Sequence, residues 1–289
     1  MASIREFSRL FTQHIGALDG HFLGRDRPLG EARLLYEIGG EGTTVAELRS
    51  RLGLDSGYTS RLLRSLTNDG LVTTRADPND RRRRIVDLTV EGEREWEVLD
   101  RLSDAQVGAM LELLGERRAV ELGELLTRAG KLIGSATVTF DSIDPLTRTA
   151  QQAMSRYFAE LHDRFDGGFD PGDALSADPE HFDPPAGEFV VGRSGEVVIG
   201  CGGLLTLEPG IGEIKRMWID PAWRGLGLAR RLLGDLERRS SGMGHRVVRL
   251  DTNAVLVEAI TMYESAGYLP ISRYCENPYA HRWFEKSLG

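Results

Sequence analysis

Residues 213–229 read Glu-Ile-Lys-Arg-Met-Trp-Ile-Asp-Pro-Ala-Trp-Arg-Gly-Leu-Gly-Leu-Ala. The apolar run that ends at Ile219 predicts a strand, and Asp220-Pro221 predicts the loop that follows it. Leucines at 228, 232, 233 and 236 recur at helical spacing, so a helix is expected to begin beside the loop. A loop between a strand and a helix N-terminus directs several unpaired amides at one point, which predicts an anion site suited to a diphosphate.

The glycines of this loop have two interpretations. Gly225 and Gly227 can let the backbone approach a ligand closely, with Arg224 adding a fixed positive charge. Alternatively, they serve only the geometry of an ordinary strand–turn–helix connection, because short glycine motifs also occur by chance.

The sequence Arg-x-x-Gly-x-Ala after a Met-x-Ile-x-Pro strand resembles the acetyl-CoA motif of the GNAT N-acetyltransferases. A second motif follows in the right order: a strand over 245–251, then Asn253, a helix with Tyr263, and Gly267-Tyr268. The resemblance covers roughly residues 136–289. It implies an α/β fold with a mixed, mostly antiparallel central sheet and acetyl-CoA as co-substrate. The remaining strands are expected at 137–140, 189–191, 197–206, 269–274 and 283–286, with a long proline-containing loop over 167–187.

The resemblance also implies roles for individual residues. Backbone groups of the strand would contact the pantetheine, and the loop amides would hold the diphosphate. The cofactor-binding residues implied are Met217, Trp218, Ile219, Arg224, Gly225, Leu226, Gly227, Leu228, Ala229, Asn253 and Tyr263.

Two residues are implied to be catalytic. Tyr263 would protonate the leaving thiolate, and a phenol with an ordinary pKa near ~10 is protonated at neutral pH. Glu213 would accept the amine proton, directly or through a water. The alternatives are a packed aromatic for Tyr263 and a solvated carboxylate at a strand start for Glu213.

The first half of the chain has a different pattern. Thr44 and Glu47 form a capping box before a helix over 45–52, and Gly53-Leu54-Asp55 makes a tight turn into a second helix that ends near Gly70. This arrangement predicts a helix-turn-helix. Two short strands, 71–75 and 85–88, bracket a charged hairpin tip, and two long helices over 91–114 and 116–133 follow.

These residues resemble the MarR family of winged-helix regulators over about residues 3–134. The family signature Asp-x-Arg-x5-Leu-Thr matches Asp80, Arg82, Leu88 and Thr89. Residues 52–62 match its turn and recognition helix. The resemblance implies a mainly α winged helix-turn-helix fold and a dimer formed through the first and last helices.

Local charge supports contact with double-stranded DNA. Residues 61–84 hold seven arginines against Asp69, Asp77 and Asp80, which gives +4 inside a chain of net charge −8. The alternative for the arginine run is a solvated turn, in part an Asp80–Arg82 pair. The residues expected to contact a near-palindromic duplex are Ser56, Tyr58, Thr59, Ser60, Arg61, Arg64, Arg82, Arg83 and Arg84.

Composition limits the remaining possibilities. A chain of 289 residues with 40% apolar residues predicts two domains, placed at 1–134 and 135–289. Cys201 and Cys275 stand alone, and the six histidines form no metal-ligand spacing, so no metal is expected. The sequence carries no signal-peptide pattern or long apolar run, which predicts a cytoplasmic protein without a membrane span.

Three functions are compatible with these patterns. The first is a bifunctional transcriptional regulator and N-acetyltransferase whose acceptor is a small amine or amino acid. The second keeps the catalysis but acetylates a lysine of another protein. The third is a regulator whose second domain only senses acetyl-CoA. The retained loop, Tyr263 and Glu213 favour catalysis over sensing.

Overall fold

The computed structural model describes residues 2–18, 20–39, 42–78, 83–170, 172, 179–195 and 197–289. The chain divides into two compact units, Met1–Leu125 and Leu126–Gly289. The division falls inside one helix, α6 (Glu116–Ala136), and the boundary expected from the sequence lies further along this helix. Among the described residues, no helix is long and apolar enough to cross a membrane.

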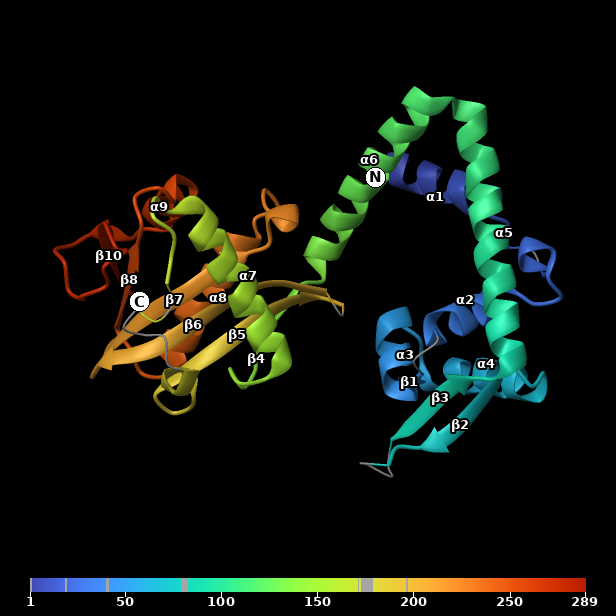
Figure 1. The fold of residues 1–289 in the computed structure, drawn as a ribbon, viewed down its shortest axis with the longest axis horizontal. Helices are drawn as coiled ribbons and strands as arrows, with labels where there is room; N and C mark the ends of the chain where they lie inside the picture. Colours follow the sequence, from blue (N-terminus) through green and yellow to red (C-terminus); the bar gives the residue numbers. More distant parts are fainter. Residues whose placement is uncertain are drawn as a thin grey trace. The chain divides into compact units, whose positions relative to one another are not determined.

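The first unit is mainly helical with a small sheet (Figure 1). Its three strands pair in the order β1-β3-β2, all antiparallel. The core is made by Leu34, Leu35, Leu48 and Leu66, which are fully buried. The elements are α1 (Ala2–His14), α2 (Leu29–Ile38), β1 (Thr43–Thr44), α3 (Val45–Leu52), α4 (Ser56–Asn68), β2 (Val72–Ala76), β3 (Arg84–Leu88) and α5 (Val90–Leu114).

The turn between α3 and α4 is fixed by its own capping residues. The Glu47 amide donates to Thr44 Oγ1 at 3.2 Å, and the Thr44 amide donates to Glu47 Oε2 at 2.9 Å, which completes the predicted capping box. Gly53 has φ 62° and ends α3, and Asp55 then caps α4 by accepting from the Tyr58 amide at 2.8 Å. The expected helix-turn-helix is therefore confirmed.

The hairpin β2–β3 extends beyond the helices of its unit (Figure 1). The Thr89 hydroxyl donates to the Gly70 carbonyl at 2.6 Å, which ties the end of the hairpin to the end of α4. A Cβ on Gly92 would collide with the Leu71 carbonyl, so α5 can pack here only without a side chain. The wing predicted from the sequence is therefore fixed to α4 and α5 at the end where Leu71 and Thr89 lie.

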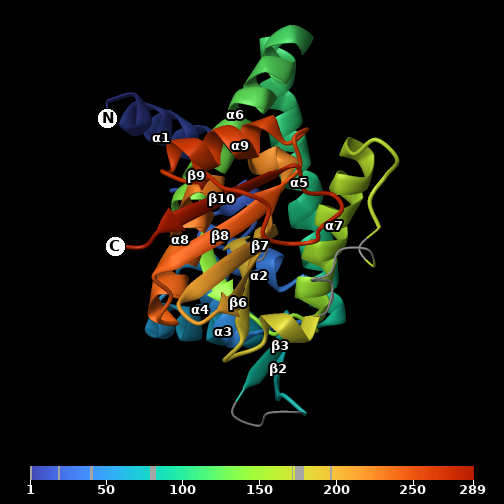
Figure 2. The same ribbon diagram turned by 90° about the vertical axis from the view of Figure 1, so that its left-hand side faces the viewer.

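The second unit contains a seven-stranded sheet in the order β4-β5-β6-β7-β8-β10-β9. Only β7 and β8 pair in parallel, so the sheet is mixed and mostly antiparallel, as predicted. Figure 2 shows β7 between β6 and β8. The elements are β4 (Thr139–Ser142), α7 (Arg148–Arg164), β5 (Gly187–Ser194), β6 (Val197–Glu208), β7 (Ile211–Ile219), α8 (Leu228–Gly242), β8 (Val247–Thr252), α9 (Val257–Ser265), β9 (Leu269–Pro270) and β10 (Arg282–Ser287), with 3-10 turns at Pro179–Phe182 and Pro221–Trp223.

Helices α7 and α8 cover opposite faces of this sheet. Met154 of α7 packs in one cluster with Val191, whereas Leu232 of α8 packs in another with Val190. Successive residues of a strand point to opposite faces, so these two clusters lie on different sides of β5.

The strand expected over 269–274 is shorter in the structure. Only Leu269–Pro270 pairs with β10, and the Ile271 amide adds one bond to the Trp283 carbonyl at 2.9 Å. The chain then leaves the sheet, and the Tyr274 hydroxyl donates to Glu213 Oε1 at 2.7 Å. A polar contact inside the unit therefore takes the place of the predicted strand.

Candidate functional site

The site begins where β7 and β8 separate. These strands pair only from Ile211–Glu213 to Val247–Arg249, and beyond this point they diverge. The register of β6 and β7 also shifts between Cys201 and Gly203, opposite Arg216, which has φ 53°. A bulge bends a strand, and the second half of β7 keeps β6 as its partner while the side that faced β8, including Met217, borders an opening.

The glycine loop lies at the end of β7. Asp220 accepts from the Ala222 amide at 2.7 Å and starts a 3-10 turn. Gly225 and Gly227 have φ 76° and 75°, a conformation that side chains oppose, and no atom lies within 4 Å of a Cβ built on either. Gly227 is the N-cap of α8 and has no side chain to cap it. The first amides of the helix therefore point into open space, as an anion site requires.

Arg224 does not offer an isolated charge to this loop. Its guanidinium bonds Glu160 of α7 at 2.5 Å, and its Nε donates to the Ile219 carbonyl at 3.0 Å. Burial raises the pKa of Glu160, but hydrogen bonds from Arg224 and Trp218 outweigh it and hold the pKa below its usual value. Arg224 thus fixes the loop against α7, while Arg230 of α8, which lines the same groove, bonds the Met262 carbonyl and Ser265 and no acid in these contacts.

A groove joins the loop to the divided strands. Its lining brings together most residues expected to contact acetyl-CoA, including Ile219 and Leu228. Wide apolar walls and backbone donors fit a long chain that carries a diphosphate. The groove is lined by Tyr157, Glu160, Leu161, Arg164, Met217, Trp218, Ile219, Trp223, Arg224, Gly225, Gly227, Leu228, Ala229, Arg230, Leu256, Glu258, Ala259, Met262 and Tyr263, with Leu226 half-buried in the same loop.

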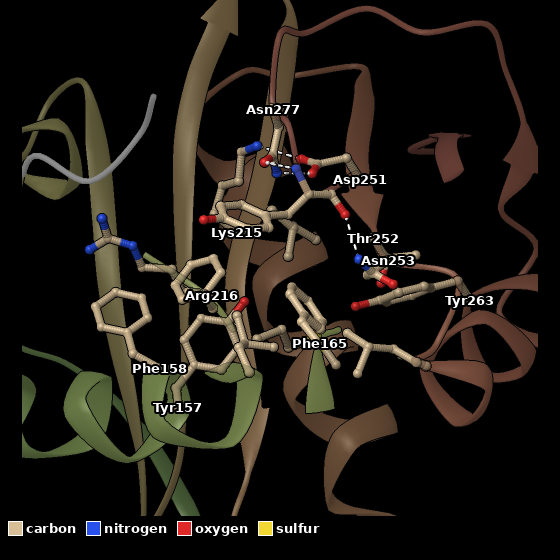
Figure 3. A pocket seen from close by; sticks show the side chains of 17 residues that line it. Tyr157, Phe158, Phe165, Lys215, Arg216, Asp251, Thr252, Asn253, Tyr263 and Asn277 are labelled. Atoms are coloured by element: carbon tan, nitrogen blue, oxygen red, sulfur yellow. Dashed lines mark hydrogen bonds and ion pairs between the residues drawn. The ribbon is translucent and has the colours of Figure 1, made fainter. Parts of the chain in front are cut away.

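Tyr263 of α9 lies at the inner end of this groove, where a second cavity begins. It lines both openings, and Figure 3 shows its hydroxyl pointing into the second cavity. Burial, with a smaller effect of Asp251, raises its pKa, so the phenol stays protonated at neutral pH and can donate. Tyr157 of α7 also lines both openings, and burial raises its pKa as well. Tyr157 is thus a residue of the site that the sequence motifs did not indicate.

Buried charges form the polar end of the second cavity. The Lys215 ammonium pairs with Asp251 and lies 3.1 Å from Glu213 Oε1. Burial lowers the Lys215 pKa, but the two carboxylates more than compensate and raise it above its ordinary value. Asn277 Nδ2 donates to Asp251 Oδ2 at 2.6 Å. We call Lys215, Asp251 and Glu213 the charged triad.

The two acids of the triad face different openings. Asp251 lines the cavity that Tyr263 enters, while Glu213 lines a neighbouring opening with Cys275. The ligand atoms of Glu213, Asp251 and Cys275 lie within 4.8 Å of one another, but the cation placed beside both carboxylates is Lys215. Proton transfer from the second cavity to Glu213 therefore needs a water or a shift of Lys215.

Asn253 supports the cavity through its amide group. Its Nδ2 donates to the Tyr279 carbonyl at 2.8 Å, and its Oδ1 accepts from the Val255 amide at 3.0 Å. The Nδ2 bond joins the end of β8 to the segment before β10, and the Oδ1 bond fixes the turn that follows β8. Asn253 lines the second cavity beside Asp251.

In the first unit, most residues of the expected DNA-contacting set on α4 are exposed. Arg61 lies over the Tyr58 ring, with its guanidinium carbon 5.6 Å from the ring centroid, and Arg64 is one turn further along. Thr59 is the exception: it is fully buried, and its hydroxyl donates to the Asp55 carbonyl at 2.9 Å. A side chain held in this way supports the turn and does not reach a duplex. Ser56 and Ser60 share the exposed face.

The hairpin carries the remaining residues of the set. Arg84 Nη2 donates to Thr74 Oγ1 at 2.8 Å, and the Asp77 amide donates to the Arg83 carbonyl at 3.0 Å. Both arginines are exposed at the base of the tip. Arg82 and Asp80 lie outside the described residues, so their expected pairing is not described.

Family comparisons agree with this division. The model of the MarR family matches residues 24–83, and the model of the acetyltransferase (GNAT) family matches residues 153–268. The HTH-type transcriptional regulator BilQ of Clostridium symbiosum is 31% identical over 90 residues, which are 31% of this chain and 62% of that protein.

The second unit has relatives that match over most of their own length. An IAA acetyltransferase of Azospirillum brasilense is 30% identical over 44% of this chain and 92% of that protein. The N-alpha-acetyltransferase RimI of Mycobacterium tuberculosis is 31% identical over 44% of this chain and 77% of that protein. A solved acyl-CoA N-acyltransferase from Klebsiella pneumoniae is 28% identical, covers 53% of this chain and 99% of its own, and has a TM-score of 0.43. The chain thus belongs to the GNAT family of acetyltransferases, whose fold uses acetyl-CoA, and carries a MarR-family winged-helix domain before its acetyltransferase domain.

Proposed function

We propose that this chain is a bifunctional protein: a dimeric DNA-binding transcriptional regulator and an acetyl-CoA-dependent N-acetyltransferase of a small amine or amino acid. The observation that carries the catalytic half is the position of Tyr263, which lines both the groove of the glycine loop and the second cavity. A donor and an acceptor that enter from these two openings meet beside one protonated phenol.

The residues of the site then divide the work. The amides of residues 225–229 bind the diphosphate, and the free edge of β7 at Met217 and Ile219 binds the pantetheine. Acetyl-CoA supplies the acetyl group as a thioester. The amine nitrogen forms the new bond to the acetyl carbon as the carbon–sulfur bond breaks. Tyr263 gives its proton to the departing sulfur, and Glu213 takes the amine proton through a water.

A small acceptor is favoured over a protein lysine by the walls of the second cavity. Half-buried rings from α7, the loop after it and the segment before β10 line the opening. An extended peptide would need an open channel on both sides of its lysine. RimI, one of the relatives, is named for protein N-termini, so peptide acceptors belong in the test.

Measuring CoA release with acetyl-CoA and either amine libraries or lysine and N-terminal peptides tests the catalytic half. We expect release with one class of small amine. CoA release with peptides alone would show that the acceptor is a protein and not a small amine. Tight binding of acetyl-CoA without turnover of any acceptor would show that the domain only senses acetyl-CoA.

The regulator half of the proposal rests on the exposed face of α4 and on the wing. Dimerisation is supported by exposed apolar side chains on the first and last helices of this region, such as Phe7 (49% exposed) and Leu125 (57% exposed). Sedimentation of the full chain tests the dimer, and a labelled near-palindromic duplex at low salt tests DNA binding. A dimer that binds no duplex would reduce this half to a dimerisation module.

A further inference from the structure

The acceptor cavity is a direct continuation of the cofactor groove. The two openings share six lining residues, and the second one extends beyond them toward Asp251. The second cavity thus adds to the shared residues a set of side chains that the cofactor groove does not contain. The shared residues are Tyr157, Leu161, Met217, Leu256, Ala259 and Tyr263.

Aromatic rings make one continuous wall of this cavity. Phe169 stacks on Phe158 with centroids 5.6 Å apart, and it lies 4.7 Å from the Tyr279 ring. Phe165 meets both Phe169 and Tyr279, at 5.9 and 5.8 Å. We call Phe158, Phe165, Phe169 and Tyr279 the aromatic wall. All four rings are half-buried and line the cavity, so each keeps part of its surface for a ligand.

Polar bonds hold the wall in place before a ligand arrives. The Phe169 amide donates to His162 Nδ1 at 3.2 Å, and the Asp170 amide donates to the Tyr279 hydroxyl at 2.9 Å. The Asn253 amide group holds the Tyr279 carbonyl at 2.8 Å. A ligand ring inserted here contacts fixed faces and edges, which are the preferred arrangements of aromatic pairs.

The Asp251 carboxylate lies at the far end of the cavity, and its side chain is only 4% exposed. The charged triad as a whole has a charge of −1, but of its two acids Asp251 lines this cavity while Glu213 lines the neighbouring opening. Arg216 also lines the cavity, with its guanidinium carbon 4.6 Å from the Phe182 centroid and 5.6 Å from that of Phe158. In Figure 3, Arg216 lies beside Phe158, while Lys215 and Asp251 lie together in another part of the cavity.

From these contacts we propose that the acceptor is a primary amine that carries an aromatic ring. The ring packs against the aromatic wall, and the Asp251 carboxylate binds the ammonium before the amine loses its proton. This inference rests on the proposed acetyltransferase function, since it names the class of acceptor for the same site.

Steady-state kinetics with two amines, one with an aromatic ring and one without, test the aromatic wall. The kcat/KM of the full-length protein should be about tenfold higher for 2-phenylethylamine than for n-butylamine, which is the upper range for one aromatic contact. Phe169→Ala should remove this preference while acetyl-CoA affinity is unchanged. Leu146→Ala, which removes an exposed apolar side chain just before α7 and outside both openings, is the control and should keep it. Equal values for both amines, or an unchanged preference in Phe169→Ala, would overturn the proposal.

Binding measurements test the charge and separate the two hypotheses. In calorimetry of the CoA-loaded protein, 2-phenylethylamine should bind, and Asp251→Asn should weaken it about tenfold or more without changing CoA affinity. If Asp251→Asn does not fold, Phe169→Ala still reports on the cavity in this assay. If 2-phenylethylamine binds but no amine is acetylated, the acetyltransferase function is wrong and the aromatic-amine site remains supported. If other amines are acetylated and 2-phenylethylamine neither binds nor reacts, the aromatic-amine site is wrong and the acetyltransferase function remains supported.

Discussion

The acetyltransferase unit and the winged-helix unit are both proposed to bind phosphates, but the groups that would bind them are held differently. In the groove, the donors are amides fixed by backbone geometry, and Arg224 is already bound to Glu160. On α4 and the wing, the donors are exposed arginine side chains such as Arg61. Fixed donors lose little freedom on binding and select one ligand shape. Solvated arginines gain mainly from counterion release, which depends on salt.

In the acetyltransferase site the function depends on a few fixed atoms, so Tyr263→Phe should have the largest effect on activity. The ring stays and the proton donor goes, so kcat should fall by roughly 10²–10⁴-fold while acetyl-CoA affinity changes little. Steady-state kinetics and calorimetry measure the two quantities. Turnover close to that of the unchanged protein would assign the proton to Tyr157, which lines the same junction, or to water.

In the winged-helix unit, the corresponding test changes the exposed arginines of the recognition helix, α4. Arg61→Ala or Arg64→Ala should weaken duplex binding, by roughly 1–3 kcal/mol where the side chain meets a base edge. Sequence preference should change with it in that case. Arg94→Ala on α5, at 72% exposure, removes one equally solvated charge away from α4 and serves as the control. If Arg94→Ala weakens binding as much, the effect comes from overall charge and the face of α4 loses its role.

The glycine loop should tolerate no added side chain. Gly227→Val places a branched side chain where the diphosphate is expected and strains a residue at φ 75°, so acetyl-CoA affinity should fall by about tenfold or more. Gly210→Val imposes a similar strain at φ 82° in the turn between β6 and β7 and is the matched control. Calorimetry that finds equal affinity in the two variants would contradict a diphosphate site at the loop.

Glu213→Gln should change the pH dependence more than the maximal rate. With a carboxylate base, the enzyme can remove a proton from the bound ammonium form of the amine. Without it, only amine that is already neutral reacts, so the rise of the rate moves to higher pH. Glu208→Gln, which removes an exposed acid paired with Arg249, should leave the profile unchanged. An unmoved profile in Glu213→Gln would pass the role of base to another group, with Asp251 the nearest candidate.

Local patterns predicted those parts of the molecule that local chemistry determines. The capping box at Thr44, the turn at Gly53 and the glycine loop depend on residues close in sequence, and all three form as expected. The burial of Thr59 was also readable, since it shares the spacing of Leu62, Leu63 and Leu66.

Contacts between residues far apart in the sequence could not be predicted from local patterns. Arg224 and Glu160 are 64 positions apart, and nothing in either neighbourhood predicts that the arginine is neutralised. The charged triad brings Asp251 from β8 beside Lys215 of β7, and Glu213 consequently lies behind a lysine instead of in the main cavity. Such contacts depend on where two strands diverge, which the sequence of each strand does not encode alone.

The wing gives the smallest and most diagnostic effect. Arg83 and Arg84 lie beside the tip of the wing, where they are expected to bind phosphates or the minor groove, so replacing both by alanine should weaken binding to many sequences alike. The log–log salt slope should flatten by roughly 0.9 for each phosphate that the variant no longer neutralises. The recognition-helix variants should instead change sequence preference. Titrations of one duplex and a scrambled duplex at several salt concentrations separate the two classes. Full affinity and an unchanged slope in the wing variant would make the arginine run a solvated turn, and DNA binding would then rest on α4 alone.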